Sequence, residues 1–174
     1  MNLAPSLQQR HHSFGLLLLL IALQLGGCGF QPRGAGMSHL NGVPSPLFIA
    51  GVARYSDLYR ELDLQLTAAG VGLTTDPAAS ASTLVISRWD RDSRVLSVDS
   101  RNKAVEYELD EVVSFALRSS TGEELLATQN ERVMRIQYRP PESLLGATRE
   151  SEVLSGDMRR ELVERIIRRL AALS

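Results

Sequence analysis

The stretch VEYELDEVVSFALR, residues 105–118, shows the clearest alternation of hydrophobic and polar residues in the chain. The odd positions are hydrophobic apart from Glu111: Val105, Tyr107, Leu109, Val113, Phe115 and Leu117. The polar side chains fall on even positions: Glu106, Glu108, Asp110, Ser114 and Arg118. A period of two predicts a β-strand with one buried face and one wet face.

Turn sequences flank this strand on both sides. DSRN at 99–102 precedes it and SSTG at 119–122 follows it, and such residues favour tight turns. A strand over 83–89, continuing less clearly over 94–98, and a strand over 124–138 are therefore expected as antiparallel neighbours. The last strand carries four hydrophobic residues that we expect on one face: Leu126, Met134, Ile136 and Tyr138. Pro140 and Pro141 should end it, because proline cannot donate to a ladder.

Two amphipathic helices are predicted around these strands. After a short hydrophobic strand at 47–52, Ser56 is a plausible N-cap for a helix over 57–69 that Gly70 ends. A final helix covers roughly 150–173, with a hydrophobic stripe at helical spacing: Leu154, Met158, Leu162, Ile166 and Leu170. The order β-α-β-β-β-α predicts an α+β two-layer sandwich, with a roughly four-stranded, mostly antiparallel sheet packed by two helices.

The N-terminal segment, residues 1–27, has the layout of a secretory signal peptide. Arg10 lies beside two histidines, and a hydrophobic run over 14–25 is followed by Gly26 and Gly27. This run is too short to span a bilayer as a helix, which takes about 20 residues. A buried N-terminal helix is the other interpretation, but the two glycines would end it where the hydrophobic run stops.

Cys28 is the only cysteine, so it cannot form an intramolecular disulfide. Leu25-Gly26-Gly27-Cys28 resembles the lipobox of bacterial lipoproteins. The resemblance implies cleavage before Cys28, acylation of its sulfur and, because Gly29 follows rather than aspartate, transfer to the outer membrane. Glycine and proline are dense over 28–46, which predicts a tether before a single domain at 47–174. A buried core thiol is the competing interpretation.

Composition excludes several function classes. After residue 27 the chain carries 18 basic and 20 acidic residues, a net charge of −2, which argues against general nucleic-acid binding. No motif of a hydrolase, zinc enzyme or phosphate-binding loop occurs, and His39 is the only histidine after residue 27. We therefore expect no enzyme activity, no metal and no cofactor.

Basic residues at strand ends are the remaining candidates for a binding site. Arg101 and Lys103 lie in the first turn, and Arg149 precedes the last helix. The last strand adds a second group: Arg132, Arg135 and Arg139. Any one of them could be ordinary surface charge, but guanidinium groups that converge would bind phosphates.

Three segments together resemble the LptE family of lipopolysaccharide-assembly lipoproteins. They are CGFQPRG at 28–34, VEYEL at 105–109 after a turn with Arg-Asn, and Arg-Arg-Leu at 168–170. The resemblance implies a plug within an LptD-type outer-membrane barrel that helps place lipopolysaccharide in the outer leaflet. It also implies lipopolysaccharide binding by basic residues, for which the matching candidates are Arg101, Arg132 and Arg149; Lys103 and Arg135 lie beside them. A subunit of another outer-membrane assembly machine and a periplasmic enzyme are the alternatives.

Overall fold

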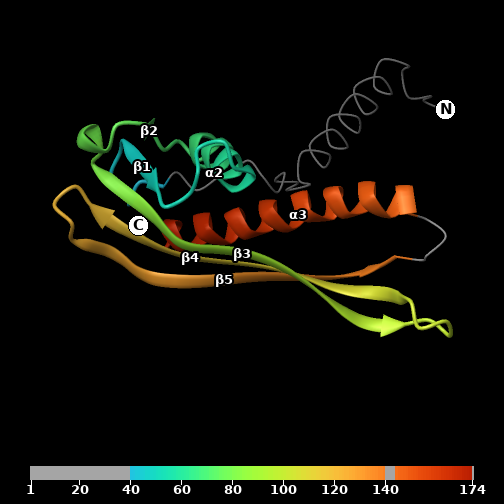
Figure 1. Ribbon diagram of the computed structural model, residues 1–174. Helices are drawn as coiled ribbons and strands as arrows, with labels where there is room; N and C mark the ends of the chain where they lie inside the picture. The colour runs from blue at the N-terminus through green and yellow to red at the C-terminus, as the bar shows by residue number, and fades with distance from the viewer. Residues whose placement is uncertain (1–39, 140–143, 174) are drawn as a thin grey trace, which may run out of the picture. The chain divides into compact units, whose positions relative to one another are not determined.

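A five-stranded sheet forms one layer of the fold and two helices form the other (Figure 1). The computed structural model describes residues 40–139 and 144–173, with the backbone alone over 144–148, and all of them belong to one compact unit, Met37–Ser174. The strands are β1 (Leu47–Ala50), β2 (Leu73–Thr74), β3 (Ser82–Val98), β4 (Ala104–Ser119) and β5 (Glu124–Tyr138). The helices are α2 (Asp57–Ala68) and α3 (Leu144–Ala171), with a short 3-10 turn at Pro77–Ala79.

The predicted α+β class is confirmed, with one strand more than expected. The order across the sheet is β2-β1-β3-β4-β5, in which β1 runs parallel to β2 and β3, while β3, β4 and β5 are antiparallel. β2 has only two residues, too few to show any periodicity in sequence. Helix α3 begins at Leu144, about six residues before the predicted start. The expected stop at Pro140-Pro141, the signal peptide and Cys28 lie outside the described residues.

Local signals in the sequence explain the ends of α2. The hydroxyl of Ser56 accepts a hydrogen bond from the Tyr59 amide at 3.2 Å, so Ser56 is the N-cap as expected. At the other end Gly70 adopts a φ of 84°, the left-handed conformation that glycine reaches without strain.

Gly51 is required by a close approach between strands. It follows β1 with a φ of 84°, and a Cβ added there would lie 2.0 Å from the carbonyl oxygen of Ile86 on β3. Any other residue would force β1 and β3 apart at the point where the chain leaves the sheet for α2.

The core lies between the helices and one face of the sheet. Leu84, Phe115 and Leu117 on β3 and β4 are fully buried. The helices supply the opposite side of the core with residues that are also fully buried: Leu58, Leu62 and Leu66 on α2, and Leu162, Val163, Ile166 and Leu170 on α3. Each such side chain contributes about 1.5–3 kcal/mol by its removal from water. The hydrophobic stripes predicted for the two helices are therefore the helix faces that form the core.

The hydrophobic face of β5 is not the one that the sequence pattern indicated. Met134, Ile136 and Tyr138 do share a face, but it is the face away from the helices, and their exposures are 47%, 63% and 60%. Leu126 lies on the other face, because a register shift between Phe115 and Leu117 of β4 breaks the alternation along β5. The buried positions of β5 are Val133 and Gln137.

The β3–β4 hairpin is long, and its outer half is covered differently from its inner half. β1 pairs with β3 only as far as Val85, so β3 has a free edge beyond that point. Most β3 residues after Ile86 are exposed, while α3 lies along β4 and β5 (Figure 1). The hairpin turn is therefore the outermost part of one end of the domain.

Candidate ligand-binding surface

The turn at the end of this hairpin is built by Asp99. Its carboxylate accepts hydrogen bonds from the backbone amides of Arg101 at 2.9 Å and Lys103 at 2.8 Å, and Asn102 takes a φ of 63°. Arg101 and Lys103 are exposed. Among the ion pairs between described residues, none involves either of them. The turn thus presents two cations to solvent on a hydrogen-bonded backbone.

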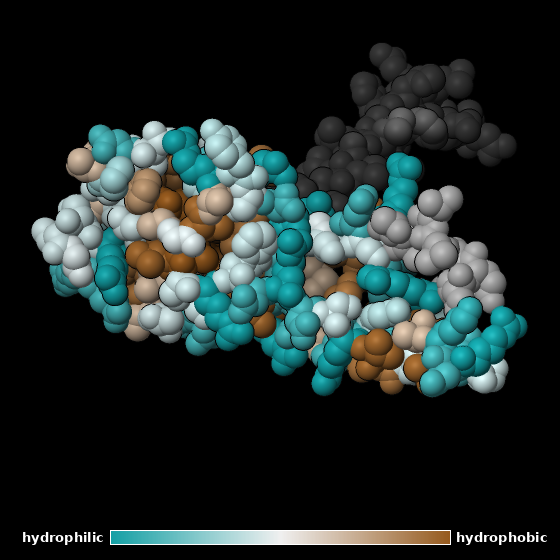
Figure 2. Space-filling view, in the orientation of Figure 1, coloured by the Kyte–Doolittle hydropathy of each residue, from teal (hydrophilic) through white to brown (hydrophobic). Residues whose placement is uncertain are grey.

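Hydrophobic side chains lie just behind these cations. Val95, Leu96 and Val98 at the end of β3 have exposures of 52%, 42% and 51%. Figure 2 shows hydrophobic and strongly hydrophilic side chains next to each other at this end of the domain. Such a surface suits a ligand with anionic and apolar parts.

Arg139, the first residue after β5, lies beside the start of β4 and so near the turn. Its amide donates to the carbonyl of Val105 at 2.7 Å, and its guanidinium lies over the ring of Tyr107 at 4.7 Å. It also donates through Nε to Gln137 at 2.7 Å. The sequence does not give the register of the strands. That register places Arg139 near the turn and the other two arginines of the last strand further away.

Arg149 lies toward the same end on α3. It is exposed, and Ser151, two residues further on, donates a hydrogen bond of 3.0 Å to the same Gln137 that Arg139 contacts. The predicted candidates Arg101, Lys103 and Arg149 therefore lie at one end of the domain, with Arg139 between the turn and α3.

Arg132 and Arg135 are not part of this group. Arg132 pairs with Val112 in the sheet and Tyr138 pairs with Glu106, so Arg132 is about 20 Å further along β5 at ~3.3 Å per residue. Its guanidinium bonds Asp110 at 2.6 Å, which raises the pKa of Arg132. Arg132 therefore does not converge with the turn, because the antiparallel register pairs it with Val112, midway along β4.

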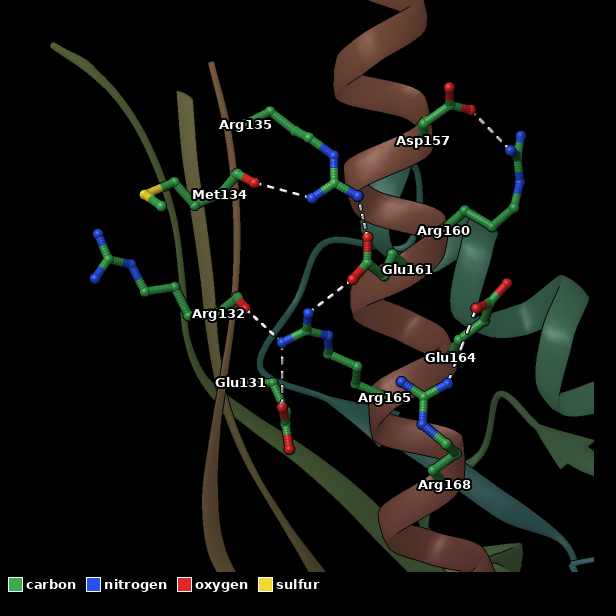
Figure 3. Close-up of polar contacts among 10 residues, drawn as sticks. All are labelled: Glu131, Arg132, Met134, Arg135, Asp157, Arg160, Glu161, Glu164, Arg165 and Arg168. Carbon is green, nitrogen blue, oxygen red and sulfur yellow. Dashed lines mark hydrogen bonds and ion pairs between the residues drawn. The ribbon is translucent and has the colours of Figure 1, made fainter. Parts of the chain in front are cut away.

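Arg135 faces the helix side of β5 and is paired there. It forms an ion pair with Glu161 of α3 and donates to the backbone carbonyl of Met134 at 2.9 Å (Figure 3). Arg165 also bonds Glu161, at 2.7 Å. These contacts, first among them the bond from Arg165, lower the pKa of Glu161. Arg135 therefore serves packing between α3 and β5 in this structure.

A second polar cluster lies under α3, around the buried Glu111. Trp89 donates to Glu111 at 2.7 Å, Arg159 lies 3.9 Å from the same oxygen, and Arg91 stacks over the Trp89 ring at 5.1 Å. Burial raises the pKa of Glu111. Two cavities of about 390 Å³ and 320 Å³ adjoin this cluster and share Arg91 and Ser155 in their walls.

The described residues offer little for metal chemistry or membrane crossing. No group of three or more potential metal ligands occurs among residues 40–139 and 144–173. Within the same ranges, neither helix has the length and hydrophobicity needed to cross a bilayer.

Comparison with known proteins identifies the fold's family. A family model described as LptE, lipopolysaccharide-assembly, matches residues 46–170, which include the five described strands, α2 and all of α3 except Ala171. The chain belongs to the LptE family. It is also 27% identical over 161 residues to the LPS-assembly lipoprotein LptE of Photorhabdus laumondii, covering 92% of this chain and 86% of that protein.

Solved structures agree with the LptE-family fold. The rare lipoprotein B of Shewanella oneidensis superposes with a TM-score of 0.61 at 24% identity, over 72% of this chain and 93% of that one. A lipoprotein B from Nitrosomonas europaea gives a TM-score of 0.66 at 23% identity, over 83% and 91% of the two chains. The LptE resemblance read from the sequence is confirmed, and with it a role in lipopolysaccharide assembly.

Proposed function

We propose that this chain is an outer-membrane lipoprotein, acylated at Cys28, that lies within an LptD-type barrel and helps place lipopolysaccharide in the outer leaflet. In this account it is not an enzyme; it binds lipopolysaccharide during transfer. The LptE-family match supports this role over a subunit of another outer-membrane machine.

We further propose that the hairpin end is the lipopolysaccharide site. The observation that carries this proposal is the pair of exposed cations Arg101 and Lys103. They form no ion pair with any described carboxylate and lie in front of exposed hydrophobic residues of β3. The phosphates of lipopolysaccharide would bond the cations, and its acyl region would cover the hydrophobic side chains. Arg139 and Arg149 add positive charge behind the turn. Arg132 and Arg135 are secondary candidates, because their guanidiniums already bond carboxylates.

A charge-reversal titration tests this site. The full chain carrying Arg101→Glu and Lys103→Glu should bind lipopolysaccharide at least tenfold more weakly, since a charge-assisted hydrogen bond contributes roughly 1.5–3 kcal/mol. The loss should shrink at high salt, because exposed charges are screened within about 10 Å at 0.1 M. Circular dichroism should show an unchanged fold.

Arg118→Glu with Arg54→Glu is the matched control, because it also changes the net charge by −4. Both residues are exposed and away from the hairpin turn: Arg118 pairs with Thr83 near the start of β3, and Arg54 lies between β1 and α2. Equal lipopolysaccharide affinity of the folded hairpin variant, the control and the unchanged chain would remove the site from the hairpin end.

A further inference from the structure

Among the described residues, the outer edge of β5 pairs with no other strand. β5 spans 15 residues and pairs on one side with β4, and it is the last strand in the sheet order. In an antiparallel pair, alternate residues direct their backbone groups away from the neighbour. Arg139 bonds Val105 of β4, so the odd positions face β4 and the even positions, Arg132 to Tyr138, face outward. Free edges of this kind are templates for another strand.

Side chains of arginine occupy part of this edge. Arg165 of α3 donates to the outward carbonyl of Arg132 at 2.7 Å, and Arg135 donates to the outward carbonyl of Met134 at 2.9 Å (Figure 3). Both guanidiniums also bond Glu161, one through each carboxylate oxygen. We call Arg135, Glu161 and Arg165 the edge clasp. One carboxylate thus orients two donors onto two outward carbonyls of this edge.

The neighbouring part of the edge carries hydrophobic side chains. Met134, Ile136 and Tyr138 project from the open face with exposures of 47%, 63% and 60%. An antiparallel pair of two β5 edges centred on Ile136 would set Ile136 against its own copy and Met134 against Tyr138. No like charges would then meet at these positions, since Arg135 would lie opposite Gln137. Cross-strand hydrophobic pairs of this kind stabilise a sheet, and a two-fold interface must be self-complementary.

We propose that the edge of β5 from Arg132 to Tyr138 is a latent pairing surface for a second copy of this chain, and that the edge clasp keeps it closed. The clasp competes for the carbonyl of Met134, which the Ile136-centred pair requires. Opening the clasp frees that carbonyl, and two chains join edge to edge beside the exposed side chains of Met134, Ile136 and Tyr138.

The test compares the clasp with an ion pair one turn further along α3. Arg135→Ala with Glu161→Ala removes the donor to the Met134 carbonyl and the carboxylate that orients it, while Glu164→Ala with Arg168→Ala removes an exposed i,i+4 pair. Both changes leave the net charge unaltered. Sedimentation of the full chain in detergent should give a dimer dissociation constant at least tenfold lower for the clasp variant than for the control or the unchanged chain.

A third change locates the dimer. Ile136→Pro removes an outward amide without touching the ladder to β4, so in the clasp variant it should restore the monomer. Equal self-association of clasp and control variants, or a dimer that Ile136→Pro leaves intact, overturns the proposal. If the double change unfolds the domain by circular dichroism, Arg135→Ala alone replaces it, with the same expected direction and the same contrary result.

Discussion

The indole nitrogen of Trp89 on β3 donates a hydrogen bond of 2.7 Å to Oε1 of Glu111 on β4, beneath α3. Glu111 is 1% exposed, and its other carboxylate oxygen has no hydrogen-bond partner among the described residues. Glu111 was the single polar residue on the buried side of the alternating strand. It places a carboxylate where the pattern called for a hydrophobic side chain.

Glu111→Gln should remove a pH dependence of stability. Burial raises the pKa of Glu111 in the folded chain, so the folded state holds the proton more tightly than the unfolded state. Its contribution to stability is then full below the unfolded pKa of about 4.3 and is lost as the pH rises through the folded value. Urea unfolding at several pH values gives the free energy of unfolding of each chain. The value for the unchanged chain minus that for Glu111→Gln should fall as the pH increases. A constant difference would mean that Glu111 does not titrate between the two states.

Gly51→Ala should destabilise the domain strongly, because the new Cβ would meet the Ile86 carbonyl oxygen at 2.0 Å and the φ of 84° disfavours alanine. Gly156→Ala in α3 is the comparison, since nothing lies within 4 Å of its added Cβ. That change should stabilise the helix by about 0.5–1 kcal/mol. Thermal melting of the two variants should move in opposite directions. A Gly51→Ala melting point at or above that of the unchanged chain contradicts the β1–β3 approach.

Leu162→Asp should unfold the domain. Leu162 is fully buried in the stripe of α3, and an unpaired charge there costs several kcal/mol against a typical stability of about 5–15 kcal/mol. Leu64→Asp on α2 is the control, since Leu64 is 64% exposed. Far-UV circular dichroism should separate the two variants, and a folded Leu162→Asp chain would show that α3 packs by another face.

Cys28→Ala should yield a chain without lipid. The lipobox-like Leu25-Gly26-Gly27-Cys28 at the end of a short hydrophobic run motivates this expectation. Mass spectrometry of the mature N-terminus should find an acylated Cys28 in the unchanged protein. Cleavage at another position, or an unmodified thiol, would refute the anchor.

The elements were predictable because their signals are local. Ser56, Gly70 and Asp99 act on neighbouring residues, and the leucine stripe of α2 is buried as its spacing predicts. The features that the sequence did not predict correctly depend on strand register. A shift opposite Leu126 changes which face each β5 residue occupies, and β2 exists only through its pairing with β1.

The candidate site also contains residues that the sequence could place and residues that it could not. The turn residues Arg101 and Lys103 could be placed from sequence, because the turn itself is local. The partners of Arg132 and Arg135 could not, because Asp110 and Glu161 reach them from other elements. Arg139 belongs with the turn only through its bond to Val105.

Photo-crosslinking in intact cells tests the central claim that lipopolysaccharide contacts the hairpin end. A crosslinking residue at Ser100, in the turn between β3 and β4, is compared with one at Thr121, in the turn between β4 and β5 at the opposite end of the sheet. Both positions are exposed. We predict a lipopolysaccharide adduct from Ser100 and little or none from Thr121. An adduct from Thr121 alone, or equal adducts from both turns, would contradict a site at the hairpin end.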